Sequence, residues 1–373
     1  MSLRRASTSS LVGLACLGLA LYAVSERSLA PVPEESYRRK LEAVRIMQRG
    51  EAAIRAAKRE RDIRIDREND PESYGVIGPQ FSLITTDRGT QAAKSLAAHP
   101  NFAAAVTRMM LEAHVGRGDL IAIGMTGSLP GLNLAVLAAC KALDAKPVVV
   151  TSLGSSMFGA TDPDLTWLDM ETVLMTKGIL PYRSGGASLG GGGDVGRGLS
   201  PAGRQLLLDA INRNHVRLLA SENLLEAVRR RVEFYDTVAT SHEKKIKLYV
   251  NVGGGVASLG GAQNARLIPA GLTKKLSALN YPNRGVLNVL AERGIPVLQL
   301  LEVEKLAREH GVTNDSGEAA RPGEGPLFVK YRYNLWIVGG AALILLAANL
   351  FVLRLDIRQQ ILGRPHPERT GTP

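Results

Sequence analysis

The residues most suited to binding a ligand lie in one short loop, GMTGSLPG at 124–131. Its glycines allow a tight turn and a close approach to the backbone, and Thr126 and Ser128 add hydroxyl groups. N–H groups at the start of a following helix favour an anion. Thr126, Gly127 and Ser128 therefore predict a site for a phosphate, a carboxylate or a sugar phosphate; the alternative is a plain strand–helix turn. The spacing fits neither GxGxxG nor GxxxxGK[ST], so it identifies no cofactor.

A second stretch, SLGSSMFGATDPDLTWLDME at 152–171, is rich in hydroxyls and carboxylates. Its candidate ligand-binding residues are Ser155, Ser156 and Asp169, and its candidate acids are Asp162, Asp164, Asp169 and Glu171. These acids either turn and cap the chain before a helix near 165, or form a cluster for a cation or for acid–base catalysis. The histidines stand isolated along the chain, so no metal site is predicted. GSLPG lacks the GxSxG spacing of a nucleophile elbow.

Two glycine-rich stretches nearly repeat one another, GGASLGG at 185–191 and GGVASLGG at 254–261. The second follows a strand-like segment, so we expect Asn251, Gly253 and Gly254 to lie at a strand end, where ligands bind. Arg183 precedes the first stretch and could pair with a carboxylate through two hydrogen bonds. The repeat suits a cleft shared by both stretches, and the alternative for 185–198 is a flexible lid.

Apolar segments that alternate with helical ones must position these loops. The segments 119–125, 147–151, 247–252 and 295–300 have the apolar, β-branched character of buried strands. Helices are expected at 91–114, 133–143, 201–214, 222–233, 284–293 and 302–310, with Ser200 as an N-cap. Strand, loop, helix and strand within 119–151 form a βαβ unit, which implies parallel strands. The predicted fold class is α/β, with a doubly wound, mostly parallel sheet (Rossmann-like).

Two apolar segments predict transmembrane helices that flank this fold. The segment 335–353 carries no charge, and at about 1.5 Å per residue it matches the hydrocarbon core of a bilayer. The segment 9–25 follows Arg4 and Arg5 and is expected to be an uncleaved signal anchor; the alternative is a cleaved signal peptide. Arginines also follow the second segment. We therefore expect a two-pass protein of the cell (inner) membrane, with both termini in the cytoplasm and the main domain outside it.

The charged, alanine-rich stretch at 34–67 has apolar residues at helical spacing. It is either a solvated helix beside the membrane or a basic face for anionic headgroups or a polyanion. The expected segments are a cytoplasmic tail (1–8), a transmembrane signal anchor (9–25), a basic juxtamembrane helical segment (26–70), an α/β domain with Gly-rich loops (71–311), a linker (312–333), a transmembrane helix (334–353) and a second cytoplasmic tail (354–373).

Composition narrows the classes of partner. The chain has 373 residues, of which 45% are hydrophobic and 22% charged, as in globular proteins, and a formal net charge of +11. This charge suits an anionic polymer or surface. Aromatic residues make up only 5% and do not interleave with basic ones, so no nucleic-acid partner is expected. The two cysteines, Cys16 and Cys140, lie in an apolar terminal segment and a predicted helix, so no disulfide is expected between them.

Four stretches of the chain resemble the family called poly-γ-glutamate system proteins. They are SYGVIGPQFSLITTDRG at 73–89, GDLIAIGMTGSLPGLN at 118–133, GSSMFGATDPDLTWLDME at 154–171 and YVNVGGGVASLGG at 249–261. The similarity runs from about 74 to 311. It implies a place beside the poly-γ-glutamate synthesis machinery, an ATP-dependent amide ligase with membrane partners that makes an anionic capsule or released polymer. The resemblance carries over no catalytic residue.

Three classes of function follow. The favoured one is a membrane-anchored accessory component of poly-γ-glutamate synthesis or export, whose α/β domain binds an anionic ligand or the polymer and whose partners are other membrane subunits. The alternative is a membrane-tethered hydrolase or transferase acting on a small acidic substrate or polymer end, and the third is an assembly scaffold. No histidine, cysteine or lysine lies near the candidate acids in the sequence, so catalysis is the less favoured hypothesis.

Overall fold

A computed structural model describes residues 8–34, 36–277, 280–314 and 316–362 of the chain. Nearly all of the first predicted tail (1–7) and the end of the second (363–373) lie outside the described residues. The chain divides into two compact units. One comprises Met1–Glu34 with Val329–Pro373, and the other is Glu35–Phe328.

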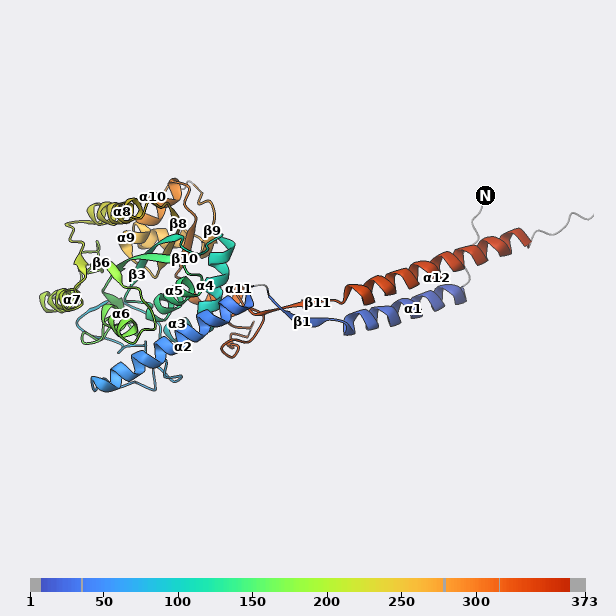
Figure 1. Ribbon diagram of the computed structural model, residues 1–373, viewed down its shortest axis with the longest axis horizontal. Helices are drawn as coiled ribbons and strands as arrows, with labels where there is room; N and C mark the ends of the chain where they lie inside the picture. Colours follow the sequence, from blue (N-terminus) through green and yellow to red (C-terminus); the bar gives the residue numbers. More distant parts are fainter. Residues whose placement is uncertain (1–7, 35, 278–279, 315, 363–373) are drawn as a thin grey trace, which may run out of the picture. The chain divides into compact units, whose positions relative to one another are not determined.

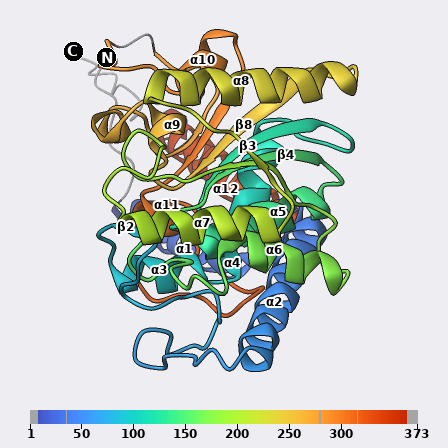
Figure 2. The same ribbon diagram turned by 90° about the vertical axis from the view of Figure 1, so that its left-hand side faces the viewer.

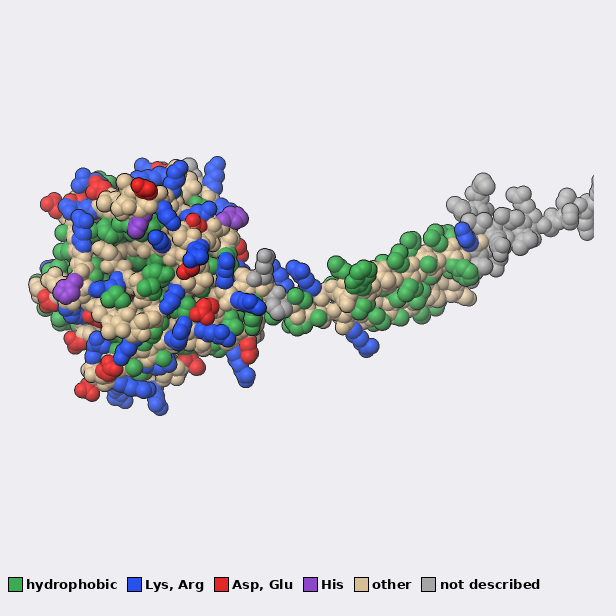
Figure 3. Space-filling model, in the orientation of Figure 1, with side chains coloured by type: hydrophobic (Ala, Val, Ile, Leu, Met, Phe, Trp, Pro, Cys, Tyr) green, Lys and Arg blue, Asp and Glu red, His purple; other side chains and the backbone are tan. Residues whose placement is uncertain are grey.

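The terminal unit consists of two helices and a two-stranded ribbon. Helices α1 (Thr8–Arg27) and α12 (Leu335–Leu362) lie side by side, and β1 (Ala30–Pro33) pairs antiparallel with β11 (Val329–Arg332) (Figure 1). Hydrophobic side chains cover much of the surface of the two helices in Figure 3. Each helix contains a 20-residue segment that is long and apolar enough to cross a membrane. The two apolar helices expected near the chain ends are therefore present, although length and composition alone also fit a signal sequence for α1.

The unit 35–328 is built on a seven-stranded sheet. Its strands are β3 (Leu120–Thr126), β4 (Lys146–Ser152), β6 (Ser184–Ser188), β7 (Arg217–Leu218), β8 (Ile246–Val252), β9 (Gly271–Thr273) and β10 (Val297–Leu300). Their order is β7-β6-β4-β3-β8-β10-β9, and only the β10–β9 pair is antiparallel. An α/β fold with a mostly parallel sheet is thus confirmed. From β3 the chain proceeds outward through β4, β6 and β7, and then returns to β8 on the other side of β3.

Helices cover both faces of this sheet, as Figure 2 shows. On one face, α8 (Leu224–Ser241), α9 (Val256–Leu259) and α10 (Val286–Glu292) pack over Leu120 and Ala122 of β3. On the other, Ile121 and Ile123 face a core formed by α4 (Asn101–Glu112), α5 (Pro130–Ala142), α6 (Trp167–Thr176), α7 (Pro201–Arg213) and α11 (Val303–Glu309). All of β3 is consequently buried, as expected for a central parallel strand.

The helices expected from the sequence are present, with one division. The stretch 91–114, expected as one helix, forms two, α3 (Gln91–Ala97) and α4. Pro100, which precedes α4, prevents one helix from running through the whole stretch. Ser200 caps α7 as predicted, since its side chain accepts a hydrogen bond from the Gly203 N–H at 3.1 Å. Local capping signals therefore placed these helix starts well.

Helix α2 (Tyr37–Glu60) corrects the interpretation of the charged stretch as a solvated helix. Its apolar face, with Val44, Met47 and Ile54, is buried against α4 and α5. The part of the predicted linker up to 328 also belongs to this unit, because Leu327 is buried and its carbonyl accepts a hydrogen bond from Lys40 Nζ at 2.8 Å, whereas 329–332 form β11 of the terminal unit. The compact unit therefore spans 35–328 and is longer than the predicted 71–311.

Candidate functional site

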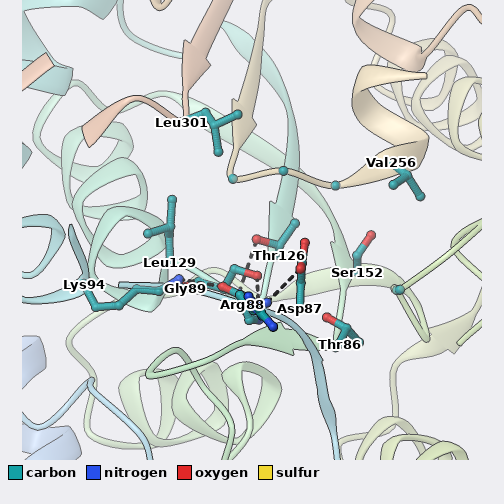
Figure 4. A pocket seen from close by; sticks show the side chains of 18 of the residues that line it. Thr86, Asp87, Arg88, Gly89, Lys94, Thr126, Leu129, Ser152, Val256 and Leu301 are labelled. Carbon is teal, nitrogen blue, oxygen red and sulfur yellow. Dashed lines mark hydrogen bonds between the residues drawn. The ribbon is translucent and has the colours of Figure 1, made fainter. Parts of the chain in front are cut away.

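A cavity of about 420 Å³ opens where the strand order reverses, at the carboxyl ends of β3 and β8. Figure 4 shows Thr86, Asp87, Thr126 and Ser152 together, with Leu301 and Val256 above them in that view. The polar side chains and glycines of the lining come from five segments of the chain: Thr86, Asp87, Arg88, Gly89, Thr90 and Lys94; Thr126 and Ser128; Ser152, Gly154 and Ser156; Gly190, Gly191, Gly192 and Asp194; and Gly253, Gly254 and Gly255. Open α/β sheets bind ligands at such reversal points.

The turn from β3 to α5 forms one wall, as the sequence predicted. Thr126 Oγ1 donates a hydrogen bond to the Val252 carbonyl at 3.3 Å and accepts one from the Ser128 N–H at 3.3 Å. A side chain at Gly127 would lie 2.4 Å from the Leu153 carbonyl oxygen, so Gly127 shapes the turn without lining the cavity. Helix α5 then begins at Pro130, with its N-terminal end beside the cavity.

The glycines that follow β8 form the facing wall. Gly253 has a φ of +87°, and a Cβ at this position would lie 2.4 Å from Thr126 Oγ1. The N–H groups of Gly254 and Gly255 donate no hydrogen bond within the described part of the chain. These donors border the cavity and are therefore free to bind an acceptor from a ligand.

The two near-repeats border the same cavity with different structures. In the first, SGGAS forms strand β6, and the glycines at 190–192 after it line the cavity. In the second, VASL forms helix α9, and the glycines before it line the cavity. The shared sequence is thus no structural duplication, and the first four residues of the segment 185–198, considered as a flexible lid, belong to strand β6 of the main sheet.

A buried lysine and a serine meet at the edge of the cavity. Serines 155 and 156 form β5 (Ser155–Ser156), which pairs with β2 (Thr85–Asp87). Lys94 of α3 has an exposed fraction of 6%; its Nζ donates a hydrogen bond to the Ser128 carbonyl and lies 2.7 Å from Ser156 Oγ. No carboxylate among the described residues forms an ion pair with Lys94. Burial lowers the pKa of Lys94 to about 8, with Asp87 opposing the shift.

A fully buried ion pair joins Asp194, in the cavity lining, to Arg231 behind it. Arg231 Nη2 of α8 donates hydrogen bonds to Asp194 Oδ2 at 2.8 Å, to Ser152 Oγ at 2.8 Å and to Ser188 Oγ at 2.7 Å. Ser152 Oγ in turn donates to Asp194 Oδ1 at 2.7 Å. These contacts tie the ends of β4 and β6 to the loop that carries Asp194, and they fix the glycines at 190–192.

Two predicted site residues support the cavity from behind its wall. Ser155 is fully buried, and its Oγ donates a hydrogen bond to the Gly127 carbonyl at 3.0 Å. Asn251 is also fully buried, and its Nδ2 donates to Gln299 Oε1 at 2.6 Å and to the Gly253 carbonyl at 2.8 Å. Both residues hold the loops in place but do not line the cavity.

The predicted carboxylates and Arg183 lie outside the cavity lining. Asp169 forms a capping box with Thr166 at the start of α6 and pairs with Arg213 at 2.6 Å. Arg183 donates to the Asn214 carbonyl. Asp162 Oδ1 accepts a hydrogen bond from the Asp164 N–H at 2.9 Å, which is ordinary turn chemistry.

Glu171, the last candidate acid, is buried away from the cavity. Its carboxylate accepts hydrogen bonds from Trp167 Nε1 at 2.7 Å and from the Ser184 N–H at 2.8 Å. Burial raises its pKa to about 7. The contacts of all four acids are thus those of turns, caps and supports, which is the first of the two interpretations of this stretch.

Of the predicted residues, Thr126, Ser128, Ser156, Gly253 and Gly254 line one cavity. The charged residues of the lining and the buried Arg231 behind it were missed; the TTDRG that carries Asp87 and Arg88 was noted only as part of a resemblance. None of the family models, curated proteins and solved structures with which the chain was compared matches it. The site therefore has to be interpreted from its own chemistry.

Proposed function

We propose that this chain is a membrane-anchored protein that binds a small anionic ligand, or the end of an anionic polymer, in the cavity at the carboxyl ends of β3 and β8. The observation that carries the proposal is the convergence of the free N–H groups of Gly254 and Gly255 with the N-terminal end of α5. Both features attract negative charge, because they present N–H groups that have no acceptor among the described residues.

The charges around the cavity agree with an anionic ligand. Asp194 is already neutralised by Arg231, so Arg88 and Lys94 face the single carboxylate of Asp87. A carboxylate or phosphate would restore the balance and would accept a hydrogen bond from the Ser128 hydroxyl. The volume of about 420 Å³ lies in the range of small-molecule sites. It suits a ligand of one or two residues, or a chain end, and not the length of a polymer.

The wider setting of this proposal follows from the sequence. We infer a doubly wound, Rossmann-like domain held outside the cytoplasm by α1 and α12 as two membrane spans. The resemblance to poly-γ-glutamate system proteins favours a γ-linked glutamate chain end as the anion and other membrane subunits of that system as the partners. Arg45 and Arg49, on the exposed side of α2, add a basic face that suits such a polymer.

Isothermal titration calorimetry on the full chain in detergent tests the proposal. The ligands are γ-linked glutamate oligomers, α-linked glutamate oligomers and sugar phosphates. The informative variant is Gly254→Ala, because a Cβ there meets only Leu301 Cδ1, at 3.9 Å, so the fold tolerates it while the methyl group intrudes beside the free N–H groups. Gly116→Ala is a matched control far from the cavity lining, since its Cβ likewise meets only one atom, at 3.9 Å.

We expect the γ-linked oligomers to bind the wild type and the Gly116→Ala variant equally, and the Gly254→Ala variant at least 10-fold more weakly. If only sugar phosphates bind, the cavity is an anion site but poly-γ-glutamate is not its ligand. The proposal fails if no anion binds, or if Gly254→Ala binds as tightly as the control.

A further inference from the structure

We propose that Ser156 and Lys94 act as nucleophile and general base, and that the site cleaves an amide or ester bond of a carboxylate-bearing ligand held in the cavity. This inference rests on the proposed function, because it takes the anionic ligand of that site as its substrate. It adds a reaction that the arrangement of carboxylates in the sequence did not suggest.

The geometry that points to this chemistry is local and specific. Ser156 Oγ and Lys94 Nζ lie 2.7 Å apart, within the range for direct proton transfer, and both residues line the cavity. The Ser156 N–H donates to Ser128 Oγ at 3.0 Å, which fixes the serine backbone. Gly89 allows the close approach of a chain segment here, since a Cβ at Gly89 would lie 3.2 Å from Ser156 Oγ and 3.2 Å from Lys94 Cε.

Three neighbouring hydroxyls, those of Thr126, Ser155 and Ser152, donate to other partners. Thr126 Oγ1 donates to the Val252 carbonyl, and Ser155 Oγ to the Gly127 carbonyl. Ser152 Oγ donates to Asp194. Among the described hydroxyls that line the cavity, Ser156 is the one that touches an amine able to take its proton. Serine–lysine pairs are an established way to activate a serine without histidine.

The surroundings of Lys94 make its neutral, basic form accessible near pH 8. The amine is buried, no carboxylate in the described part of the chain pairs with it, and its pKa of about 8 lies far below that of an exposed lysine. Neutral Lys94 has two hydrogens and one lone pair, so it can donate to the Ser128 carbonyl while it accepts the hydrogen of Ser156 Oγ. Asp87 opposes this by favouring the charged form.

The reaction then balances with water as the co-reactant. Ser156 Oγ attacks the carbonyl carbon of the ligand as its proton passes to Lys94 Nζ; the C–N or C–O bond breaks, and Lys94 returns the proton to the leaving amine or alcohol. The acyl group is now an ester of Ser156. Lys94 next takes a proton from water, which attacks that ester, and the proton returns to Ser156 Oγ as the acid leaves. An amine in place of water would give transfer of the acyl group.

A fluorophosphonate probe tests the nucleophile directly, because it forms a covalent adduct with an activated serine whatever the natural substrate is. The full chain in detergent is incubated with the probe between pH 6 and pH 9.5, and mass spectrometry of its peptides locates and quantifies the adduct. We expect an adduct on the peptide that contains Ser156, and none in Ser156→Ala. Ser241→Ala, an exposed serine at the end of α8, is the control and should be labelled like the wild type.

The role of Lys94 is tested by rate and by pH. Lys94→Met should slow labelling at least 100-fold, which is the usual contribution of a general base, while Lys177→Met, an exposed lysine, should leave it unchanged. The wild-type rate should rise about 10-fold per pH unit below pH 8 and level off above it. The other charged groups that border the same cavity are Asp87, Arg88 and Asp194.

Two results would overturn the inference: no adduct on Ser156 in the wild type up to pH 9.5, or undiminished labelling of a folded Lys94→Met variant. Calorimetry on the wild type keeps this outcome separate from the proposed function. Anion binding without an adduct on Ser156 rejects the reaction alone, and an adduct on Ser156 without anion binding rejects the proposed ligand.

Discussion

The ion pair of Arg231 and Asp194 gives the sharpest prediction about stability. The side chains of the two residues are 2% and 1% exposed, and their closest charged atoms lie 2.8 Å apart. Arg231→Met keeps much of the volume of the arginine stem and leaves the Asp194 carboxylate buried without its partner. Removing one member of a buried pair costs about 3–5 kcal/mol of unfolding free energy, mainly because the remaining charge stays desolvated.

The control is the same substitution at an exposed pair. Arg293 and Asp236 also lie 2.8 Å apart, but their side chains are 44% and 46% exposed. Solvent screens such a pair, so Arg293→Met should cost at most about 1 kcal/mol. Equal distance with unequal burial therefore separates the effect of desolvation from that of direct attraction.

Urea unfolding of the full chain in detergent measures both costs. The chain has two tryptophans, and Trp167 is fully buried in the α/β unit. In a Trp336→Phe background, the fluorescence of Trp167 alone reports the unfolding of this unit. Asp194→Asn combined with Arg231→Met should recover part of the loss, since no net charge is then left buried. A loss below about 1 kcal/mol for Arg231→Met, or no recovery in the double variant, would refute the reasoning.

Three further predictions concern other parts of the chain. The pKa of Glu171 is about 7 in the folded state and near 4.5 in the unfolded state. The unfolding free energy should therefore fall by up to about 3 kcal/mol as the pH rises from 4.5 to 7. Urea titrations should show this fall in the wild type and not in Glu171→Gln. A Cβ at Gly131 would lie 2.6 Å from the Ala97 carbonyl oxygen, so Gly131→Ala should separate α5 from α3 and cost about 1–3 kcal/mol in the same assay. Alkaline phosphatase fused after Gly198 should be active and after Pro373 inactive; the opposite pattern would reject the proposed topology.

The elements of the sheet could be predicted because their signals are local. Apolar, β-branched runs gave β3, β4, β8 and β10, and Ser200 and the prolines gave helix starts. The role of α2 could not be predicted, because a charged amphipathic helix has the same pattern whether its apolar face meets a membrane, water or a protein core. Only the tertiary contacts of Val44, Met47 and Ile54 decide between these.

The candidate site was predicted where it depends on strand ends, and missed where it depends on packing. Thr126, Ser128 and Gly253 follow strands directly, so the rule for parallel sheets places them. Lys94 lies 62 residues before Ser156 on a short helix, and no periodicity brings the two together. The carboxylates at 162–171 were considered as a catalytic or cation-binding cluster, because a capping box and such a cluster use the same residue types.

The pairing of β1 with β11 brings the two ends of the α/β unit together, so that this unit could be removed or exchanged. In this ribbon Pro33 lies opposite Val329, so the points where the chain leaves and re-enters the helical hairpin are about 5 Å apart. The nearly 300 residues between these two points are thus an insertion into the hairpin. Without them, a two-residue Asn-Gly turn would be long enough to connect β1 to β11. Excision of 34–328 with such a closure would give a minimal hairpin that retains α1, α12 and the ribbon. The same junction would accept an unrelated domain whose ends lie close together. The helical hairpin and the α/β unit are therefore separable in the gene.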